Sequence, residues 1–546
     1  MSDFDPRHLV TELEDNVKKQ DLIKAKLVLE HIDGVDLKTQ KKLLHILEHG
    51  KPDFAGPLLV SLISQNADPA GQLPELKGAL MAVALRHPGI LLKTIEDKVA
   101  PREVFISMAG ELRMQEAATG LMEILVREMD EDILKEAVTA LGSIGDPSAT
   151  NAISEFLYSN HKSLIIAATR SLGQIGTPTA MQRLSEKMGS DPQLDILILD
   201  IFSQVQDHVS LNRLNQSLCS HYAHLRNYAK SKLVRIGPKA VPMLCDNLLH
   251  DDPDLLIHTL NVLGDIGDSS ALTFIRKMLG KEPRDPNVRF AAYEALGRMP
   301  LDKGAYILAR GLTDPEEHVC VVAASAIDQN LNQVLAAGVK NMVRQRDQDA
   351  IKTVRAIISA QAKNLLIAVL EEEAFQEMAV DYLLQCTAPD VRDNYRALLQ
   401  KYGYMDLARK LQIQESRDEI RPLALAVDDS KMILKIYKST LYELGFEPVL
   451  FEYPAEALEW LQKNKPEAVF TDLNMPEITG IEFIGRAREL YPEQGLPIIM
   501  VTTQNEVQDN ERARQAGVSD ITFKPFTAES LKLALDGVRQ TGRPST

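Results

Sequence analysis

The stretch Leu423-Ala-Leu-Ala-Val-Asp-Asp-Ser430 decides the fold of the last part of the chain. Its apolar run, Leu423–Val427, predicts a strand that is buried on both faces, as in a parallel sheet. Helical stretches alternate with four further runs of this kind, at Pro448–Phe451, Ala468–Thr471, Pro497–Thr502 and Ile521–Phe523. The alternation over residues 422–540 predicts a doubly wound α/β domain with a five-stranded parallel sheet, of the flavodoxin-like type.

Polar side chains stand where these strands end. Asp428 and Asp429 follow the first strand, Asp472 follows the third, Thr502 ends the fourth and Lys524 follows the fifth. The carboxyl ends of parallel strands meet at one edge, so we expect three carboxylates to converge there, where they would repel one another unless a cation lay among them. Mg²⁺ prefers oxygen ligands of this kind. The carboxylates, the lysine and the hydroxyl together suit a phosphoryl group in transfer.

Four motifs carry a resemblance to a known family. They are Asp428-Asp-Ser430, Asp472-Leu-Asn-Met-Pro476-Glu-Ile-Thr-Gly480, Met500-Val-Thr502 and Phe523-Lys-Pro-Phe526. The intervals from Asp429 to Asp472, from there to Thr502 and on to Lys524 are 43, 30 and 22 residues. In order and spacing, residues 422–540 resemble the receiver domain of response regulators, in its compact, chemotaxis-regulator-like form.

The resemblance assigns the phosphoryl and metal chemistry. It implies that Asp472 is the phosphoacceptor. It also implies that Asp429, Asp472 and the main-chain oxygen of Asn474 bind Mg²⁺, with Asp428 in the outer shell. We therefore expect Mg²⁺ as the cofactor, and a sensor histidine kinase or a histidine phosphotransfer protein as the phosphodonor.

The remaining family positions are also occupied. Thr502 and Lys524 would bind the phosphoryl oxygens. Ile521 stands at the switch position, where the family often has an aromatic residue, so the usual aromatic coupling is not expected. Asn474 and Gln504 occupy positions that tune how fast the phosphoryl group is lost.

A different pattern fills the chain before this domain. Seven helical segments end in a similar phrase, and the spacings between successive phrases are 31, 30, 31, 30, 33 and 31 residues. The first residues of the phrases are Leu141, Leu172, Phe202, Leu233, Leu263, Leu296 and Ile327. Small residues before each phrase allow helices to pack closely, and glycines at 145, 176 and 267 suit left-handed helix caps.

Two helices per repeat of this length resemble HEAT repeats, specifically the short kind also found in phycobilin lyases. We therefore predict an α-helical HEAT-like solenoid over residues 1–412, clearest at 105–330, then a linker at 413–421, the receiver domain at 422–540 and a tail at 541–546. The four cysteines lack metal-type spacing and are expected to be small buried residues in a reducing compartment.

Composition narrows the function. The net charge of −16 and the aromatic content of 5% argue against a nucleic-acid partner. No stretch approaches 18 uninterrupted apolar residues, and the first residues lack a signal-peptide pattern, so we expect a cytoplasmic protein without membrane insertion.

The sequence favours a two-component response regulator. Its solenoid would serve as a protein-interaction output or docking module for a partner that the sequence does not identify. We expect no enzymatic activity beyond the receiver's own phosphotransfer and dephosphorylation. The alternatives are a phosphate sink for a kinase, or a HEAT-like enzyme of the chromophore lyase or DNA glycosylase type regulated by the receiver.

The short predicted linker suggests that the two parts communicate. We expect a receiver face near Arg512 and Ile521–Phe523 to contact either the last solenoid repeats or a second receiver in a dimer.

Overall fold

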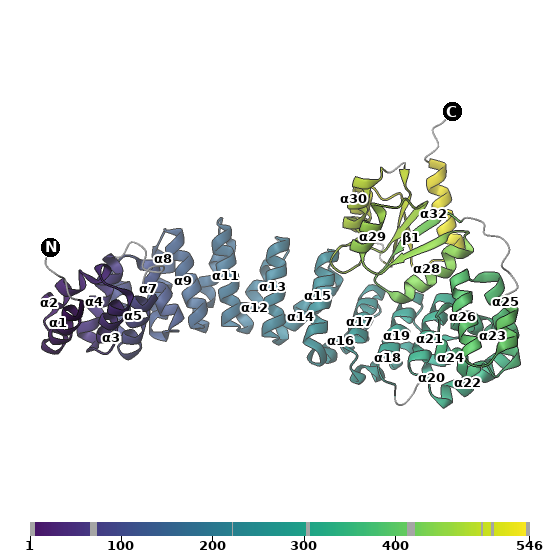
Figure 1. The fold of residues 1–546 in the computed structure, drawn as a ribbon, viewed down its shortest axis with the longest axis horizontal. Helices are drawn as coiled ribbons and strands as arrows, with labels where there is room; N and C mark the ends of the chain where they lie inside the picture. The colour runs from purple at the N-terminus through teal and green to yellow at the C-terminus, as the bar shows by residue number, and fades with distance from the viewer. Residues whose placement is uncertain are drawn as a thin grey trace. The chain divides into compact units, whose positions relative to one another are not determined.

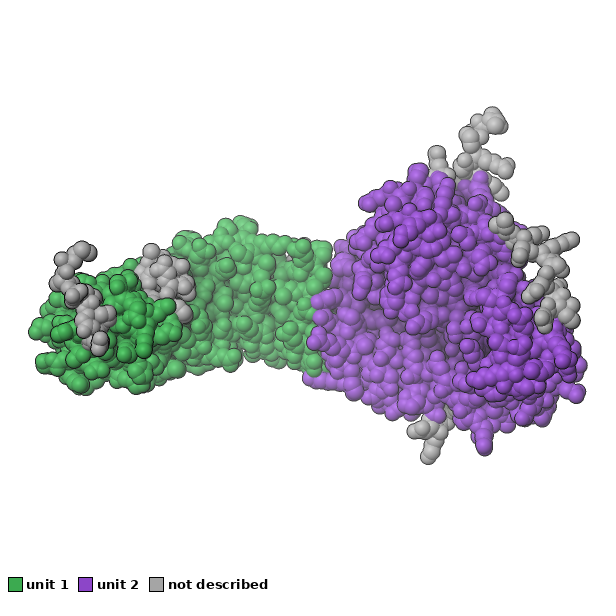
Figure 2. Space-filling view, in the orientation of Figure 1, with its two compact units in different colours: residues 1–213 green, residues 214–546 purple. Residues whose placement is uncertain are grey.

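The computed structural model describes residues 6–65, 74–189, 191–220, 222–301, 306–411, 421–492, 495–503 and 507–541. The chain forms two compact units, residues 1–213 and 214–546 (Figure 2). The first unit is helical, and the second combines further helical repeats with an α/β domain. Of the predicted linker at 413–421, only Arg421 falls within the described residues, and of the predicted tail at 541–546, only Thr541.

The first unit is built of paired helices (Figure 1). Those helices are α1 (Pro6–Lys19), α2 (Leu22–Leu29), α3 (Leu37–Glu48), α4 (Pro52–Gln65), α5 (Pro74–Arg86), α6 (Gly89–Glu96), α7 (Arg102–Glu111), α8 (Ala118–Arg127), α9 (Glu131–Ile144), α10 (Thr150–Ser154), α11 (Lys162–Ile175), α12 (Pro178–Lys187) and α13 (Pro192–Val205). The boundary between the units falls inside α14 (His208–Gln216).

Helical pairs continue in the second unit. We call residues 214–411 the C-terminal repeats. Their helices are α15 (Ala223–Ile236), α16 (Val241–Asn247), α17 (Pro253–Ile266), α18 (Leu272–Leu279), α19 (Pro286–Arg298), α20 (Tyr306–Gly311), α21 (Glu317–Gln329), α22 (Gln333–Arg344), α23 (Gln348–Ser359), α24 (Lys363–Val369), α25 (Glu373–Cys386), α26 (Pro389–Lys401) and α27 (Met405–Lys410). Within this unit α15, α17, α19, α21, α23 and α25 pack each against the next.

The repeated phrase forms the core of the solenoid. The first residue of all seven phrases, from Leu141 to Ile327, is fully buried. Gly145, Gly176 and Gly267 end their helices with φ values of 78°, 66° and 70°. The predicted left-handed caps are therefore confirmed, because such φ values favour glycine.

Close helix packing explains the small residues in the repeats. A Cβ atom on Gly142 would lie 2.5 Å from the Cα of Ser171 on the neighbouring helix. A Cβ atom on Gly264 would lie 2.9 Å from the Cα of Ala295. The helices approach so closely that a methyl group at either glycine would collide with the facing backbone.

The α/β domain of the second unit has the predicted architecture. Its elements are β1 (Leu423–Val427), α28 (Lys431–Glu443), β2 (Glu447–Phe451), α29 (Pro454–Leu461), β3 (Ala468–Thr471), α30 (Gly480–Leu490), β4 (Ile498–Thr502), α31 (Val507–Gln515), β5 (Asp520–Phe523) and α32 (Ala528–Thr541). The strands are all parallel, in the order β2-β1-β3-β4-β5. This is the flavodoxin-like order, and the central strands β3 and β4 are buried along their whole length.

The α/β domain packs on the C-terminal repeats within the second unit. Helix α28 contacts α21, α23 and α25 (Figure 1). Lys435 donates a hydrogen bond to the Ala360 oxygen at 2.5 Å, and Lys438 forms an ion pair with Asp390. The first helix of the domain is therefore a main contact with the repeats, and no motif in the sequence predicts it.

Two sequence-based expectations need correction. Cys245 and Cys320 are buried as expected, but Cys386 is only partly buried and Cys219, at the end of a short 3-10 helix, is exposed. Arg512 does contact the repeats, over the ring of Tyr222 at 4.9 Å. The larger part of the contact, however, involves α28 and the carboxylate edge of the sheet rather than Ile521–Phe523.

Candidate functional site

Three carboxylates converge at the carboxyl edge of the sheet. Asp428 follows β1 and is fully buried, and Asp429 is next to it. Asp472 follows β3 and is 7% exposed. Ser430 caps α28, and its backbone N–H donates to the Asp428 carboxylate at 2.9 Å. The strand ends therefore hold the aspartates where the sequence predicted them.

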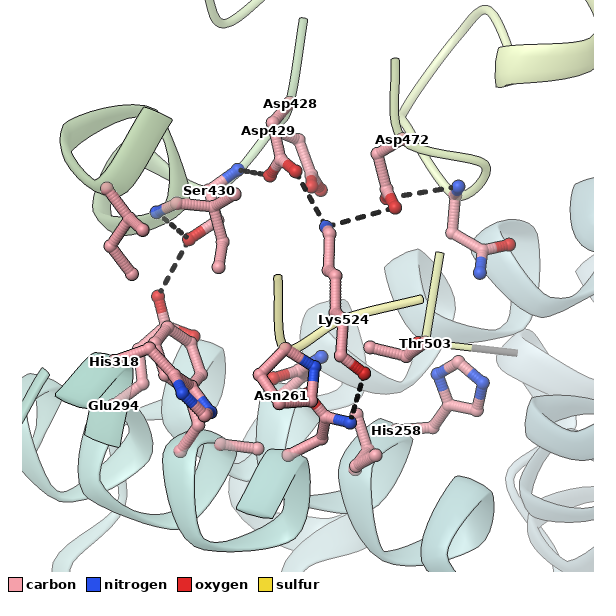
Figure 3. Close-up of a pocket in the computed structure, with 18 of the residues that line it drawn as sticks. His258, Asn261, Glu294, His318, Asp428, Asp429, Ser430, Asp472, Thr503 and Lys524 are labelled. Carbon is pink, nitrogen blue, oxygen red and sulfur yellow. Dashed lines mark hydrogen bonds and ion pairs between the residues drawn. The ribbon is translucent and has the colours of Figure 1, made fainter. Parts of the chain in front are cut away.

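Lys524 joins two of these carboxylates. Its Nζ lies 2.6 Å from Oδ2 of Asp428 and 3.0 Å from Oδ1 of Asp472, and its side chain is 10% exposed (Figure 3). Lys524 follows β5 and Asp472 follows β3, and β4 lies between these two strands in the sheet. The Lys524 side chain therefore reaches along the carboxyl edge of the sheet to Asp472. One buried ammonium group is thus shared between two carboxylates.

The three carboxylates and the lysine of this edge shift one another's pKa values. Burial raises the pKa of Asp428 to about 7, and Asp472 and Asp429 add to this rise while Lys524 opposes it. Burial and the charge of Asp472 raise the pKa of Asp429 to about 6. Burial alone would lower the pKa of Lys524, but Asp428 and Asp472 hold it above its ordinary value. A further cation would stabilise the ionised carboxylates.

The loop after β3 shapes the surroundings of Asp472. The backbone N–H of Asn474 donates to Asp472 Oδ2 at 3.1 Å. A Cβ atom on Gly480 would lie 2.0 Å from the backbone oxygen of Asp472, so only glycine fits there. Thr479 and Glu482 form a capping box that starts α30 just beyond this loop.

The other predicted residues occupy these places. Thr502 ends β4 and is fully buried, while its neighbour Thr503 lines the cavity at the carboxylate edge. Ile521 lies in β5, partly buried against the domain core. Gln504 lies outside the described residues. The roles of Thr502, Ile521 and Gln504 therefore stay predictions.

A cavity of about 120 Å³ adjoins the carboxylates, and the C-terminal repeats form its opposite wall (Figure 3). The domain contributes Asp428, Asp429, Asp472, Asn474, Thr503 and Lys524, among others. The repeats contribute, among others, Asn227, Lys230, His258, Asn261, Asn287, Glu294 and His318. Two segments far apart in the sequence thus enclose one cavity with both polar and apolar walls.

Polar contacts from the repeats reach the edge itself. Arg226 donates to the side-chain oxygen of Asn474 at 2.8 Å and pairs with Asp509 at 3.3 Å. Asn227 donates to the Met475 oxygen at 2.9 Å. These contacts place residues of α15 directly beside the loop that carries Asp472.

Helix α19 makes a second set of contacts. Asn287 donates to the Lys524 oxygen at 2.8 Å, and Glu294 accepts from the Ser430 hydroxyl at 3.3 Å. Sequence reasoning missed these residues because each lies more than 130 positions from its partner. The one signal in the sequence is a polar residue at an uncommon position of an amphipathic repeat. That signal does not show which residue of the receiver the polar residue contacts.

Comparison with known proteins identifies the family of the α/β domain. Residues 424–536 match the response regulator receiver domain family. A Campylobacter jejuni protein described as a chemotaxis protein CheY homolog is 41% identical over 120 residues, covering 22% of this chain and 92% of that protein. The chain belongs to the response regulator receiver family. The receiver is also similar to chemotaxis protein CheY1 of Helicobacter pylori, with 40% identity over 119 residues, 21% of this chain and 96% of that protein.

A solved structure and a second family complete the comparison. The chemotaxis protein CheY4 of Vibrio cholerae, crystallised at low pH, is 32% identical, and the match covers 22% of this chain and 98% of that one with a TM-score of 0.21. HEAT repeats match residues 118–197 and 241–328. The chain therefore joins HEAT repeats to a receiver domain. None of the helices in the described parts of the chain is long and apolar enough to cross a membrane.

The site suits the Mg²⁺ ion that its family implies. Asp428, Asp429 and Asp472 present hard oxygen donors at one edge of the sheet, and Lys524 contacts Asp428 and Asp472 there. A small divalent cation that prefers oxygen ligands fits such a set of donors.

Proposed function

We propose that this response regulator accepts a phosphoryl group on Asp472 from a sensor histidine kinase or a histidine phosphotransfer protein. The observation that supports the proposal is the position of Lys524, whose ammonium lies 3.0 Å from Asp472 and 2.6 Å from Asp428. A buried lysine there faces the place where the transferred phosphoryl oxygens would gather charge.

Each residue has a definite part in the transfer. An Asp472 carboxylate oxygen attacks phosphorus, the bond from phosphorus to the donor imidazole nitrogen breaks, and the imidazole leaves and takes up a proton. Lys524 stays close enough to pair with the phosphoryl oxygens. Mg²⁺, held by Asp429, Asp472 and the Asn474 oxygen, would supply charge neutralisation during the transfer. Asp428 orients Lys524 through their ion pair.

The C-terminal repeats serve, in this proposal, as the docking module of the receiver. Support comes from the polar contacts that Arg226, Asn227, Asn287 and Glu294 make with the carboxylate edge. A phosphate sink would need the repeats only to dock the receiver, whereas contacts directly beside Asp472 would respond to its phosphorylation. The proposal therefore favours an adapter, in which phosphorylation alters contacts between the receiver and the repeats, and it includes no catalysis beyond the receiver's own phosphotransfer and dephosphorylation.

Labelling with a small phosphodonor tests the acceptor. With Mg²⁺ and acetyl phosphate, the full chain should gain one base-labile phosphoryl group, and Asp472→Asn should abolish it. Asp520→Asn is the matched control, because Asp520 is an exposed aspartate at the opposite end of β5. Equal labelling of the Asp472→Asn variant and the wild type would show that the acceptor is another residue. A purified phosphohistidine protein in place of acetyl phosphate tests the donor class.

A further inference from the structure

Arg226 of helix α15 is a buried arginine that binds the receiver at Asn474, beside Asp472. Its side chain is 2% exposed and donates to the Ser220 oxygen at 2.7 Å within the repeats. Across the cavity wall it donates to Asn474 Oδ1 at 2.8 Å and pairs with Asp509, which is also 2% exposed, at 3.3 Å. The planar guanidinium can hold three acceptors at once in a fixed geometry, which a lysine cannot do.

Asn474 stands directly beside the acceptor carboxylate. Its backbone N–H donates to Asp472 Oδ2 at 3.1 Å, and its side chain lines the same cavity as Asp472 and Lys524. The Asn474 carboxamide therefore lines the cavity through which water would reach a phosphoryl group on Asp472. The carboxamide oxygen is a neutral acceptor able to orient the water, but a charged donor from α15 occupies it.

Loss of the phosphoryl group is a balanced hydrolysis. Water attacks phosphorus as the bond from phosphorus to the Asp472 oxygen breaks, so the acyl phosphate dianion and water give the Asp472 carboxylate and dihydrogen phosphate. Both water protons leave with the phosphate. The rate depends on how well the attacking water is held in line with the breaking bond.

We infer that Arg226 is a positioning residue through which the HEAT repeats set the lifetime of the phosphoryl group on Asp472. In the docked molecule Arg226 holds the Asn474 oxygen away from the attacking water, and the phosphoryl group persists. When the repeats release the receiver, Asn474 becomes able to orient the water, and hydrolysis accelerates. The inference rests on the proposed function of Asp472 and adds to it a regulator within the same chain.

The test measures how fast phosphorylated full-length protein loses its label after acetyl phosphate is removed. Arg226→Lys keeps a positive charge near Asp509 but cannot hold both receiver partners. It should shorten the lifetime about tenfold, the scale of one charge-assisted hydrogen bond. Asn474→Ala should cancel the effect, so that Arg226→Lys/Asn474→Ala loses its label no faster than Asn474→Ala.

Two further variants separate the effect of the hydrogen bond from Arg226 to Asn474 from that of a general loosening of the contact between the repeats and the receiver. Asp509→Asn weakens the buried ion pair but leaves the bond from Arg226 to Asn474. Lys438→Ala removes a contact on α28, away from the carboxylates. Both should keep the wild-type lifetime.

Each other outcome is decisive. An unchanged lifetime in Arg226→Lys overturns the inference, as does an acceleration that persists without the Asn474 side chain. An acceleration by Lys438→Ala or Asp509→Asn that persists when Asn474→Ala is added would also overturn it, because a looser contact would then act on the phosphoryl group without the Asn474 carboxamide. A wild-type protein that takes no label on Asp472 would instead refute the proposed function, and the inference with it.

Discussion

Helix α11 in the first unit and helix α15 in the second are built on the same repeat but differ in the residue seven positions before the repeated phrase. Both bury the leucine that begins the repeated phrase, Leu172 and Leu233, completely. Seven residues earlier, α11 carries the partly exposed Ile165, whereas α15 carries the buried Arg226 that binds the receiver. The repeated residues therefore build the solenoid, and the residues that break the repeat give one part of it a partner.

The buried ion pair gives the largest test of this comparison. Arg226→Met would leave Asp509 as an unpaired carboxylate in a buried place, and losing one member of such a pair costs about 3–5 kcal/mol. The cost should appear as faster hydrogen exchange in α31 and the receiver loops.

Arg310→Met is the matched control. Arg310 pairs with Glu282, but their side chains are 54% and 74% exposed. An exposed pair contributes roughly 0–1 kcal/mol, so this variant should exchange as the wild type does. A loss no larger in Arg226→Met than in Arg310→Met would show that the buried pair contributes no more to stability than an exposed one.

The same position shows how far sequence reasoning reaches. Seven residues before the phrase, four repeats carry an uncharged residue (Leu134, Ile165, Leu256 and Cys320) and one carries Asp195, so an arginine there departs from the commoner pattern without being the first charged residue at that position. Arg289 occupies the equivalent place in α19, however, and pairs with Asp314 inside the solenoid at 2.8 Å. The pattern marks both arginines as unusual, but only the structure shows that Arg226 reaches a different domain.

The carboxylate edge was more predictable for a physical reason. Asp428, Asp472 and Lys524 each follow a strand, and parallel strands bring their carboxyl ends to one edge whatever the loops do between them. The wall formed by the repeats follows no such rule. Arg226 and Asn474 are 248 positions apart, and no local pattern encodes the docking of one domain on another.

Close helix packing gives the next largest effect and applies to both units. Gly142→Ala would place a methyl group 2.5 Å from the Cα of Ser171, and Gly264→Ala would place one 2.9 Å from the Cα of Ala295. Overpacking of this kind costs about 1–3 kcal/mol. The Gly264 variant should also disturb the receiver, because Ala295 adjoins Glu294 in the cavity wall, whereas the Gly142 variant should leave phosphorylation unchanged.

Gly120→Ala is the control for these variants. Gly120 lies in α8, and a Cβ atom there would meet nothing within 4 Å. Alanine is favoured over glycine inside a helix by about 1 kcal/mol, so this variant should melt at the same temperature as the wild type or slightly higher. If all three variants melted alike, close helix contact would not be what the glycines provide.

Folding stability should depend on pH in opposite directions for His258 in the cavity wall and for the aspartates of the carboxylate edge. Burial, with the nearby charges of Arg226 and Lys230, lowers the pKa of His258 to about 3. The unfolded chain therefore binds a proton that the folded chain does not. The stability that His258 contributes is full above pH 6.5 and is lost as the pH falls below it, by about 1.4 kcal/mol per pH unit.

Asp428 and Asp429 act in the opposite direction. Their raised pKa values mean that the folded chain holds extra protons, so stability falls as the pH rises from about 4 toward their pKa values of about 7 and 6. In Mg²⁺-free buffer, His258→Asn should therefore remove the gain between pH 4 and 6.5 and leave only the decline. A wild type and variant with parallel denaturation profiles over that range would show that His258 is not buried in neutral form.

The smallest expected effect comes from the outer part of the same domain contact. Lys438 pairs with Asp390, whose side chain is 56% exposed, so water and salt screen the pair and Lys438→Ala should cost about 0–1 kcal/mol. Hydrogen exchange of α28 at low and high salt measures this directly. The wild type should approach the variant as salt rises, whereas the contact of Arg226 with Asp509 should be nearly insensitive to salt, because both side chains are 2% exposed. A large, salt-independent loss in Lys438→Ala would reverse that ranking. The receiver would then be held mainly through α28, and the buried residues beside Asp472 would be free to respond to phosphorylation without carrying the attachment.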